Sequence, residues 1–269
     1  MKVRIQGMRE EQVRQLTGCR YAVVMTMCGL LARSIHPNKL GAPFRRSVAT
    51  MVVAALVRLR SGNPYRSLAI QLGIPHVTLR RYVNLVCDLL ERLPLLTSKD
   101  SDDRAWLAVD STCVRVRCVQ SADYSGYKNH KNRKAQVIVD DRRRIVAVSD
   151  AHPGAVHDKT IWDREFEKVE HLLDRPTLGD KAYAGGKGEG AILFRPIKRN
   201  ETAWKTDKDE CRSSNRELSK KRVRIEHVFA RMKTFRILRD MFPCSPDRFG
   251  SVFKAIAYIH NLIMAENGD

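Results

Sequence analysis

The chain has 269 residues, of which 43% are apolar, so its composition supports a buried core and excludes a globally disordered protein. Lys and Arg total 49 against 30 Asp and Glu, which gives a net charge of +19. Solubility needs a much smaller excess of charge, so this one predicts a polyanionic partner, and nucleic acid fits better than an anionic membrane.

The composition also favours a cytoplasmic protein with no membrane partner. The longest nearly apolar run covers residues 21–32 and is too short to span a bilayer. Residues 1–15 carry charges where a secretory signal needs an apolar stretch. The seven Cys form no CxxC pair and have no zinc-finger spacing with His, so we expect ordinary thiols.

Helices separated by glycines are predicted in the amino-terminal part. One helix covers 45–62; after it, residues 63–93 form a helix that Asn63 caps, a Gly-Ile-Pro turn, and a second helix that opens at Pro75. This is the helix-turn-helix plan, in which the start of the second helix enters the major groove of DNA. An ordinary helical hairpin has the same pattern and stays open as the alternative. The side chains there that can contact bases or phosphates are His76, Thr78, Arg80 and Arg81.

A polar segment, residues 97–104, separates this helical part from a region with strand patterns. We therefore expect a helical DNA-binding domain over 1–98 and a mixed α/β domain over 104–265. The elements predicted in the second domain are a strand in 106–119, a hairpin of strands 135–140 and 145–150, a helix over 158–175, short strands in 176–180 and 191–198, and helices over 212–242 and 249–264.

Two acids stand at unusual places in this pattern. Asp110 follows an apolar run inside a predicted strand, where a buried carboxylate is costly unless it is paired or binds a cation. Asp180 follows another short strand, and a strand end that faces a cleft is a common place for function. Carboxylate oxygens suit Mg²⁺ or Mn²⁺, so both acids are candidate metal ligands.

A third acid, Glu226, lies among basic residues on the helix predicted over 212–242. It falls at the edge of an apolar stripe, where a side chain can point into a cleft. Glu226 could pair with neighbours one turn away on a solvated helix, or it could hold a metal while the basic groups hold phosphates. The stripe consists of Ile225, Phe229, Met232 and Arg236, with Val228 beside it.

Three carboxylates close together would repel one another without cations. Two metal ions about 3.5–4 Å apart would relieve that repulsion and form a clamp suited to phosphoryl transfer. On spacing alone three acids among 30 are weak support. The adjacent pair His157 and Asp158 could also bind metal, but a supporting role is preferred because a metal site needs further ligands.

Residues 105–263 resemble the DDE superfamily of transposases, in particular the bacterial insertion-sequence-four and insertion-sequence-five groups. The likeness lies in AVDST (108–112), YSGYKNHKNRKAQVIVD (124–140), IVAVSDAHPGAVHD (145–158) and TLGDKAY (177–183). The family's third motif is Tyr-x2-Arg-x3-Glu-x6-Lys. Arg222, Glu226 and Lys233 match its spacing, whereas Ser219 stands at the Tyr position and cannot stack on a base.

The resemblance implies an RNase H-like catalytic domain with a mixed sheet and helices on both faces. It implies that Asp110, Asp180 and Glu226 bind two Mg²⁺ or Mn²⁺ ions, and that Arg222 and Lys233 contact DNA. The basic run 128–134, which begins at Lys128, is either a phosphate contact or a solvated face.

The function predicted from this resemblance is that of a transposase, located with the bacterial nucleoid. It would bind terminal inverted repeats in double-stranded DNA, cleave the element's ends, and let the freed 3′-hydroxyl attack target DNA. A homodimer on DNA is expected, because pairing two ends needs two active sites. One alternative is a non-catalytic helix-turn-helix regulator, and another is a nuclease of the same fold that cuts but does not join.

Overall fold

The computed structural model describes residues 7–34, 47–95, 105–117, 123–126, 129–173 and 175–267. Its internal contacts divide the chain into two compact units. The helical unit combines Met1–Pro94 with Met232–Asp269, and the sheet unit is Leu95–Arg231. The predicted segment 97–104 lies outside the described residues.

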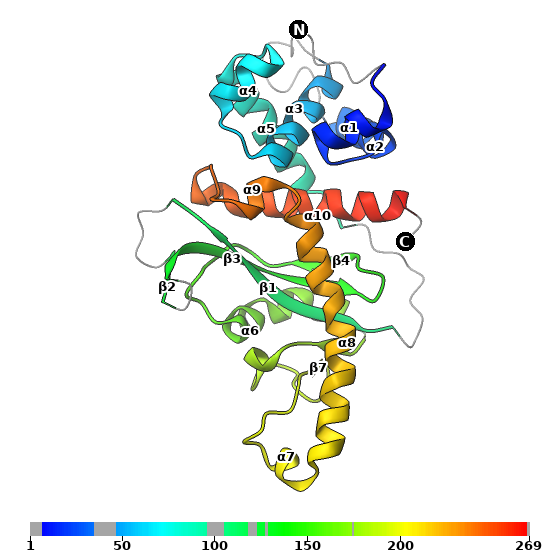
Figure 1. Cartoon of the computed structure of the whole chain (residues 1–269), viewed down its shortest axis with the longest axis vertical. Helices are drawn as coiled ribbons and strands as arrows, with labels where there is room; N and C mark the ends of the chain where they lie inside the picture. Colours follow the sequence, from blue (N-terminus) through cyan, green and yellow to red (C-terminus); the bar gives the residue numbers. More distant parts are fainter. Residues whose placement is uncertain are drawn as a thin grey trace. The chain divides into compact units, whose positions relative to one another are not determined.

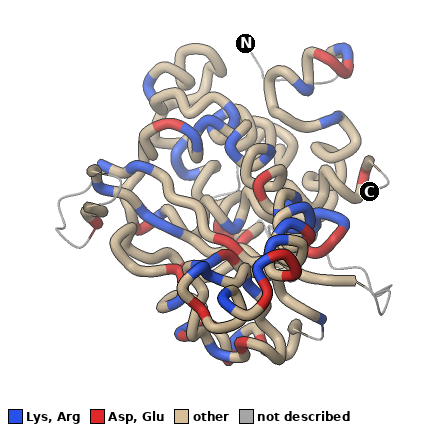
Figure 2. The backbone as a smooth tube through the Cα atoms, turned by 60° about the horizontal axis from the view of Figure 1, so that its bottom comes forward, with Lys and Arg blue, Asp and Glu red and all other residues tan. Residues whose placement is uncertain are grey.

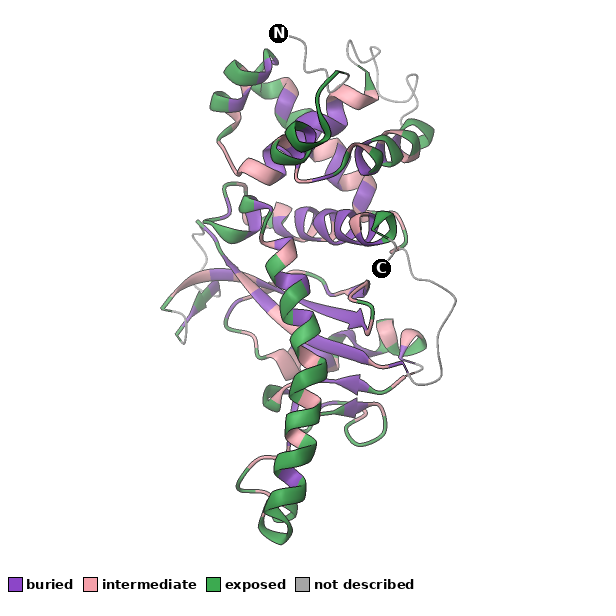
Figure 3. Cartoon of the chain, turned by 45° about the vertical axis from the view of Figure 1, so that its right-hand side comes forward, coloured by how far each residue is buried: buried purple, intermediate pink, exposed green. Residues whose placement is uncertain are grey.

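The helical unit is built around helix α3, Val48–Ser61, whose residues Met51–Leu59 are all buried (Figure 3). Ser47 caps its start by accepting a hydrogen bond from the Thr50 amide, and Gly62 ends it with a left-handed φ of 67°. The predicted helix over 45–62 is therefore confirmed. The other helices of this unit are α1 (Glu10–Thr17), α2 (Tyr21–Ser34), α4 (Tyr65–Leu72), α5 (His76–Glu91), α9 (Arg236–Arg239), η5 (Pro246–Arg248) and α10 (Phe249–Glu266).

The carboxy-terminal helix α10 packs against α5, within the helical unit. Most of its residues are buried, and Arg248 at its start forms a 2.6 Å ion pair with Asp88 of α5. We had expected residues 104–265 to form one domain, but the contacts place Met232–Asp269 with the amino-terminal helices. Packing in the folded protein determines which elements an apolar helix contacts, and the order of elements along the chain does not reveal these contacts. Where the functional domains divide stays a prediction.

The sheet unit contains a seven-stranded mixed sheet (Figure 1). Strand β1, Leu107–Arg115, lies between β3, His130–Asp140, which is antiparallel to it, and β6, Thr177–Leu178, which is parallel. The predicted mixed α/β fold is thereby confirmed for this unit, and so is the hairpin of β3 and β4. The remaining strands are β2 (Tyr124–Ser125), β4 (Ile145–Val148), β5 (His152–Pro153) and β7 (Leu193–Phe194).

Helices α6, Asp158–Val169, and α8, Lys208–Met232, flank this sheet (Figure 1). Trp162 of α6 joins the buried core formed by Leu107, Val109 and Ile138 of the central strands. Its indole nitrogen also donates to the Lys187 carbonyl at 2.9 Å, which fixes the glycine-rich segment 184–190 against α6. Because side chains alternate along a strand, this packing assigns one face of β1 to α6 and leaves the other face for α8.

Two details of the helix predictions were wrong. The helix predicted over 212–242 begins earlier, at Lys208, and ends at Met232; a turn and α9 follow it, and Arg236 is exposed instead of continuing the apolar stripe. Asn63 does not cap α4, because Pro64 occupies the capping position. Among the described residues, no helix is both long and apolar enough to cross a membrane.

Candidate active site

Asp110 lies in the middle of β1 on the face that meets α8. Its Oδ1 accepts a 2.7 Å hydrogen bond from the Ser111 amide, and its Oδ2 lies 3.6 Å from Nη2 of Arg222 on α8. Burial raises the pKa of Asp110 to about 6, and the charges of Asp180 and Asp158 add to this, while the Ser111 amide and Arg222 act in the opposite direction. Ionising Asp110 is therefore harder than ionising a free carboxyl, and a cation beside it would favour the charged form.

Asp180 is placed beside Asp110 by the register of two parallel strands. Ala108 of β1 pairs with Leu178 of β6, and each acid follows its paired residue by two positions. Asp180 caps a short 3-10 helix, η4 (Lys181–Tyr183), because its Oδ1 accepts a 2.7 Å hydrogen bond from the Ala182 amide. The structure thus brings together the two acids that the sequence singled out as following strands.

Glu226 lies on α8 one turn beyond Arg222 and is exposed. Arg222 contacts Asp110, so the part of α8 that touches β1 there lies one turn before Glu226. No group of three His, Cys, Asp or Glu in the described part of the chain is arranged to hold a metal ion. The three-acid ligand set stays a prediction, although two of its members are adjacent and the third lies on a helix that contacts one of them.

A buried polar network lies on the other face of β1, across the sheet from Asp110. The Ser111 hydroxyl donates to Asp158 Oδ1 at 2.5 Å, and Lys134 Nζ donates to the same oxygen at 2.9 Å. Gln136 Nε2 bridges the Asp158 carbonyl, at 3.2 Å, and the Tyr183 hydroxyl, at 2.9 Å. Ser111 directly follows Asp110 on β1, and Lys134 and Gln136 lie on the adjacent strand β3. Tyr183 ends the 3-10 helix that Asp180 caps.

Sequence reasoning found only one member of this network, Asp158, for which it preferred a supporting role. Lys134 looked like one more cation in a basic run, yet its side chain is only 11% exposed. The burial of Lys134 could have been predicted from the alternation of side chains along β3, which places Lys134 and Gln136 on the same face of the sheet as Ser111. Burial together with the charges of Asp158, Asp110 and Asp180 raises the pKa of Tyr183 well above its usual range, so its hydroxyl stays protonated.

The family's sequence pattern, described as DDE superfamily endonuclease, matches residues 109–261, more than half of the 269. This chain belongs to the DDE superfamily endonucleases. The match begins one residue before Asp110 and spans both Asp180 and Glu226. Membership confirms the superfamily that the motifs predicted, while the insertion-sequence-four or insertion-sequence-five type stays a prediction.

Two curated relatives are similar to this DDE superfamily chain. A protein from Streptomyces albus G, named as a transposase for insertion sequence element IS112, is 32% identical over 160 residues, which cover 59% of each chain. A protein from Microchaete diplosiphon, named as a transposase for insertion sequence element IS702, is 28% identical over 156 residues, 58% of this chain and 55% of that one. The chain thus spans less than two thirds of these relatives' length. No solved structure is significantly similar to it.

DDE superfamily endonucleases generally use divalent metal ions, and the donor chemistry of this site fits such an ion. Asp110 and Asp180 carry the oxygen donors that such ions prefer, they interact electrostatically, and the neighbouring acids add to the rise that burial causes in the pKa of Asp110. Arg222 alone does not saturate the site, and its buried Nε has no hydrogen-bond partner among the described residues. A cation here would therefore offset a repulsion that is already present between the carboxylates.

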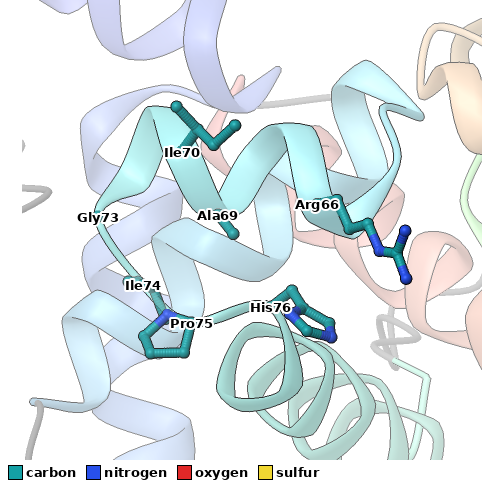
Figure 4. A pocket seen from close by; sticks show the side chains of 7 residues that line it. All are labelled: Arg66, Ala69, Ile70, Gly73, Ile74, Pro75 and His76. Carbon is teal, nitrogen blue, oxygen red and sulfur yellow. The ribbon is translucent and has the colours of Figure 1, made fainter.

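The predicted DNA contacts are distributed over several elements. His76, Arg80 and Arg81 are exposed at the start of α5, and Thr78 there is half-buried. Arg66 and His76 lie on one side of a hollow between α4 and α5, with Ile70 and Pro75 on its rim (Figure 4). This geometry is compatible with a helix-turn-helix, which stays a prediction.

The remaining predicted contacts lie elsewhere. Lys233 directly follows α8 and belongs to the helical unit, whereas Lys128 lies outside the described residues. Ser219 is exposed on α8, and its hydroxyl donates to the Asn215 carbonyl at 2.8 Å.

Proposed function

We propose that this chain is a transposase that binds the terminal inverted repeats of an insertion sequence in double-stranded DNA. It cleaves the element's ends by hydrolysis and passes the freed 3′-hydroxyl to target DNA. The observation that carries the proposal is the pairing of Asp110 and Asp180 on adjacent parallel strands, with α8 meeting Asp110 through Arg222. The transposase names of the two relatives support the same conclusion.

In this proposal Asp110, Asp180 and Glu226 hold two Mg²⁺ or Mn²⁺ ions, which when bound supply positive charge to the reacting phosphate. The chain's own groups orient the reaction. The Ser111 amide fixes the rotation of the Asp110 carboxylate. Arg222 donates to phosphate oxygens beside the scissile bond. Both chemical steps are in-line displacements at phosphorus, so positioning and charge are the main contributions of the protein.

DNA is held outside the acid site by several groups in this proposal. His76, Thr78, Arg80 and Arg81 read or grip the terminal repeat, and Lys233 contacts the DNA near the cut. The excess of Lys and Arg along the described chain is visible in Figure 2 and favours such binding. We further propose that the protein acts as a homodimer on DNA, because two ends must be processed together, and that it is located with the bacterial nucleoid.

The proposal is tested by metal-dependent cleavage of duplexes that carry the element's own flanking repeats. Wild type is compared with Asp110→Asn and Glu226→Gln, with and without Mg²⁺. We expect site-specific nicks only from wild type with Mg²⁺, while both variants still bind the ends. Bound DNA without nicks in any protein would instead favour the regulator, and nicking without joining of a pre-cut 3′-hydroxyl end would favour a simple nuclease.

A further inference from the structure

The amino-terminal half of α8 extends beyond the sheet within the sheet unit, together with the short helix α7, Thr202–Thr206 (Figure 1). Most residues over 208–221 are exposed, as the green ribbon of this segment shows (Figure 3). Such an extension buries little apolar surface, so the core of the sheet unit does not account for its length.

Five cations recur at every fourth position along this helix: Lys208, Arg212, Arg216, Lys220 and Arg224. All five are exposed, and we call them the α8 basic stripe. Four residues advance about 6 Å along a helix and turn about 40° beyond a full circle, so the stripe winds slowly over about 24 Å. Like charges four residues apart destabilise a helix, so helix stability does not explain this pattern.

The acids on α8 do not neutralise the stripe. Asp209 pairs with Arg212 at 3.0 Å and Glu217 lies 3.8 Å from Lys220, but all four side chains are at least 65% exposed. Exposed ion pairs of this kind contribute little and exchange readily with another anion. Arg216 forms no ion pair with any residue that the structure describes. Lys208, Arg212, Arg216 and Lys220 are therefore available to a polyanion, whereas Arg224 is engaged with the Asp141 carbonyl and the Trp106 ring.

The side of this helix that carries Cys211 and Asn215 is anchored. The Asn215 side chain accepts a 2.8 Å hydrogen bond from the Ile197 amide and donates a 3.0 Å one to the Ile197 carbonyl. One turn earlier, buried Cys211 donates through sulfur to the Ala203 carbonyl of α7 at 3.4 Å. These contacts hold the extension in one orientation, so little ordering is needed on binding. Arg216 and Lys220 lie at least about 100° around the helix from both anchoring residues.

Along the helix axis, the stripe ends at the level of the candidate active site. Its last member, Arg224, lies over the Trp106 ring at 5.7 Å, and Arg222 two residues earlier faces Asp110. From Lys208 to Arg222 is 14 residues, or about 21 Å of helix, which corresponds to about six base pairs at 3.4 Å each.

We propose that the α8 basic stripe binds the phosphate backbone of duplex DNA over about six base pairs on one side of the cleaved position. This inference rests on the proposed function and adds to it the position of the DNA that flanks the cleaved site. Cations at regular spacing on a rigid, anchored helix suit a stiff duplex. Single-stranded nucleic acid is favoured by interleaved aromatic residues, and residues 208–224 contain none. The contact is electrostatic and independent of base sequence.

The test uses the full chain and a 40-base-pair duplex without divalent ions. The variant Arg212→Gln with Arg216→Gln removes two stripe charges. Arg212→Lys with Arg216→Lys keeps both charges at the same positions. Arg164→Gln with Lys168→Gln removes two exposed charges from α6 in the same unit. Binding is measured against salt concentration, and hydroxyl-radical footprints are taken on a duplex that carries the repeat.

We expect the salt slope of log K to become shallower by about 1.8 in the stripe Gln variant, since each lost phosphate contact removes about 0.9. The Lys swap and the α6 variant should keep the wild-type slope. Neutralising Lys208, Arg212, Arg216 and Lys220 together should shorten the footprint by about six base pairs on one side only.

An unchanged slope in the stripe Gln variant would overturn the inference, as would an equal loss in the α6 variant or in the Lys swap. A stripe effect confined to single-stranded DNA or RNA would overturn it as well. If wild type nicks its ends while the stripe variants bind like wild type, only this inference fails. If wild type binds no duplex at all, the proposed function fails with it.

Discussion

Arg222 and Asp110 face each other between α8 and β1, with 3.6 Å between Nη2 and Oδ2. The contact joins a residue of the predicted third motif to the first predicted acid, 112 positions apart in the chain. It supplies a positive charge to Asp110 and brings the turn of α8 that precedes Glu226 to β1, the strand that carries Asp110.

The first prediction concerns this contact. Arg222 lowers the pKa of Asp110 against the larger effect of burial, so Arg222→Gln should move that pKa further above about 6. Binding of Mn²⁺, followed by electron paramagnetic resonance across pH, should then require a higher pH than in wild type. Arg222→Lys keeps the charge and serves as the matched control. An unchanged pH midpoint in Arg222→Gln would contradict the coupling.

The second prediction concerns stability without metal. Folding raises the pKa of Asp110 from 3.8 to about 6, so the folded protein binds this proton more tightly than the unfolded chain does. The resulting stabilisation is present below about pH 4 and is lost as pH rises through about 6. At pH 7.5, Asp110→Asn should therefore increase the free energy of unfolding by about 1–3 kcal/mol.

Urea denaturation in chelator at pH 7.5 and pH 4 measures this effect, and the gain should nearly vanish at the lower pH. Glu226→Gln is the control, because an exposed substitution should change the free energy of unfolding by less than about 0.5 kcal/mol at either pH. If Asp110→Asn destabilises the protein at pH 7.5, the carboxylate is better paired than the contacts with Ser111 and Arg222 indicate.

Much of this site could be predicted from sequence, because local pattern determined it. The apolar run before Asp110 predicted β1, and Thr177 and Leu178 before Asp180 form the short parallel strand that was expected. The network beneath the acids could not be predicted in the same way. Lys134 and Asp158 are 24 positions apart, and Ser111 and Asp158 are 47 apart, so their contacts depend on strand register and on how α6 docks.

The break in the last long helix shows a different limit. Apolar residues continue with helical spacing past Met232, which predicted one helix to 242. Instead, the chain turns at 233–235, and Phe235, Ile237 and Leu238 are buried in the helical unit. The Phe235 amide donates to the Met232 carbonyl at 3.1 Å and closes the turn. Tertiary packing overrode local propensity here, and sequence periodicity carries no information about that choice.

The third prediction concerns the ion pair of Lys134 and Asp158, whose side chains are 11% and 20% exposed. Lys134→Met should lower the free energy of unfolding by about 2–4 kcal/mol, because it leaves a largely buried carboxylate beside Asp110 without its counter-ion. Adding Asp158→Asn should restore part of that loss. Lys187→Met, which removes the exposed ion pair with Glu167, is the matched control and should cost less than about 1 kcal/mol. Equal losses in the two single variants would show that burial does not strengthen the Lys134 pair.

The fourth prediction concerns Tyr183, whose hydroxyl accepts a 2.9 Å hydrogen bond from Gln136. Tyr183→Phe keeps the ring that packs edge-on against Trp162 and removes only the hydroxyl. The free energy of unfolding should fall by about 1 kcal/mol, because Gln136 Nε2 keeps its contact with the Asp158 carbonyl. Tyr183→Leu also removes the ring and should cost clearly more in the same urea titration. A Tyr183→Phe protein as stable as wild type would exclude an energetic role for this bond.

The fifth prediction concerns Ser219, which stands where the resembled family has Tyr. Ser219 is exposed on α8, and its hydroxyl bonds only to the Asn215 carbonyl of its own helix in the described structure. Ser219→Tyr should therefore fold normally, with a change in the free energy of unfolding below about 0.5 kcal/mol. The new ring would lie one turn from Arg222 on α8, the residue proposed to contact phosphates beside the scissile bond.

We expect Ser219→Tyr to bind a duplex end with unpaired terminal bases more tightly, by about 1–3 kcal/mol, because an aromatic ring can stack on a base and Ser cannot. Affinity for a fully paired duplex should stay unchanged. Fluorescence of 2-aminopurine placed at the unpaired position reports stacking directly, and Ser219→Leu controls for added apolar surface. Equal gains for Tyr and Leu would exclude stacking, and no gain for either would place the unpaired bases away from this turn of α8.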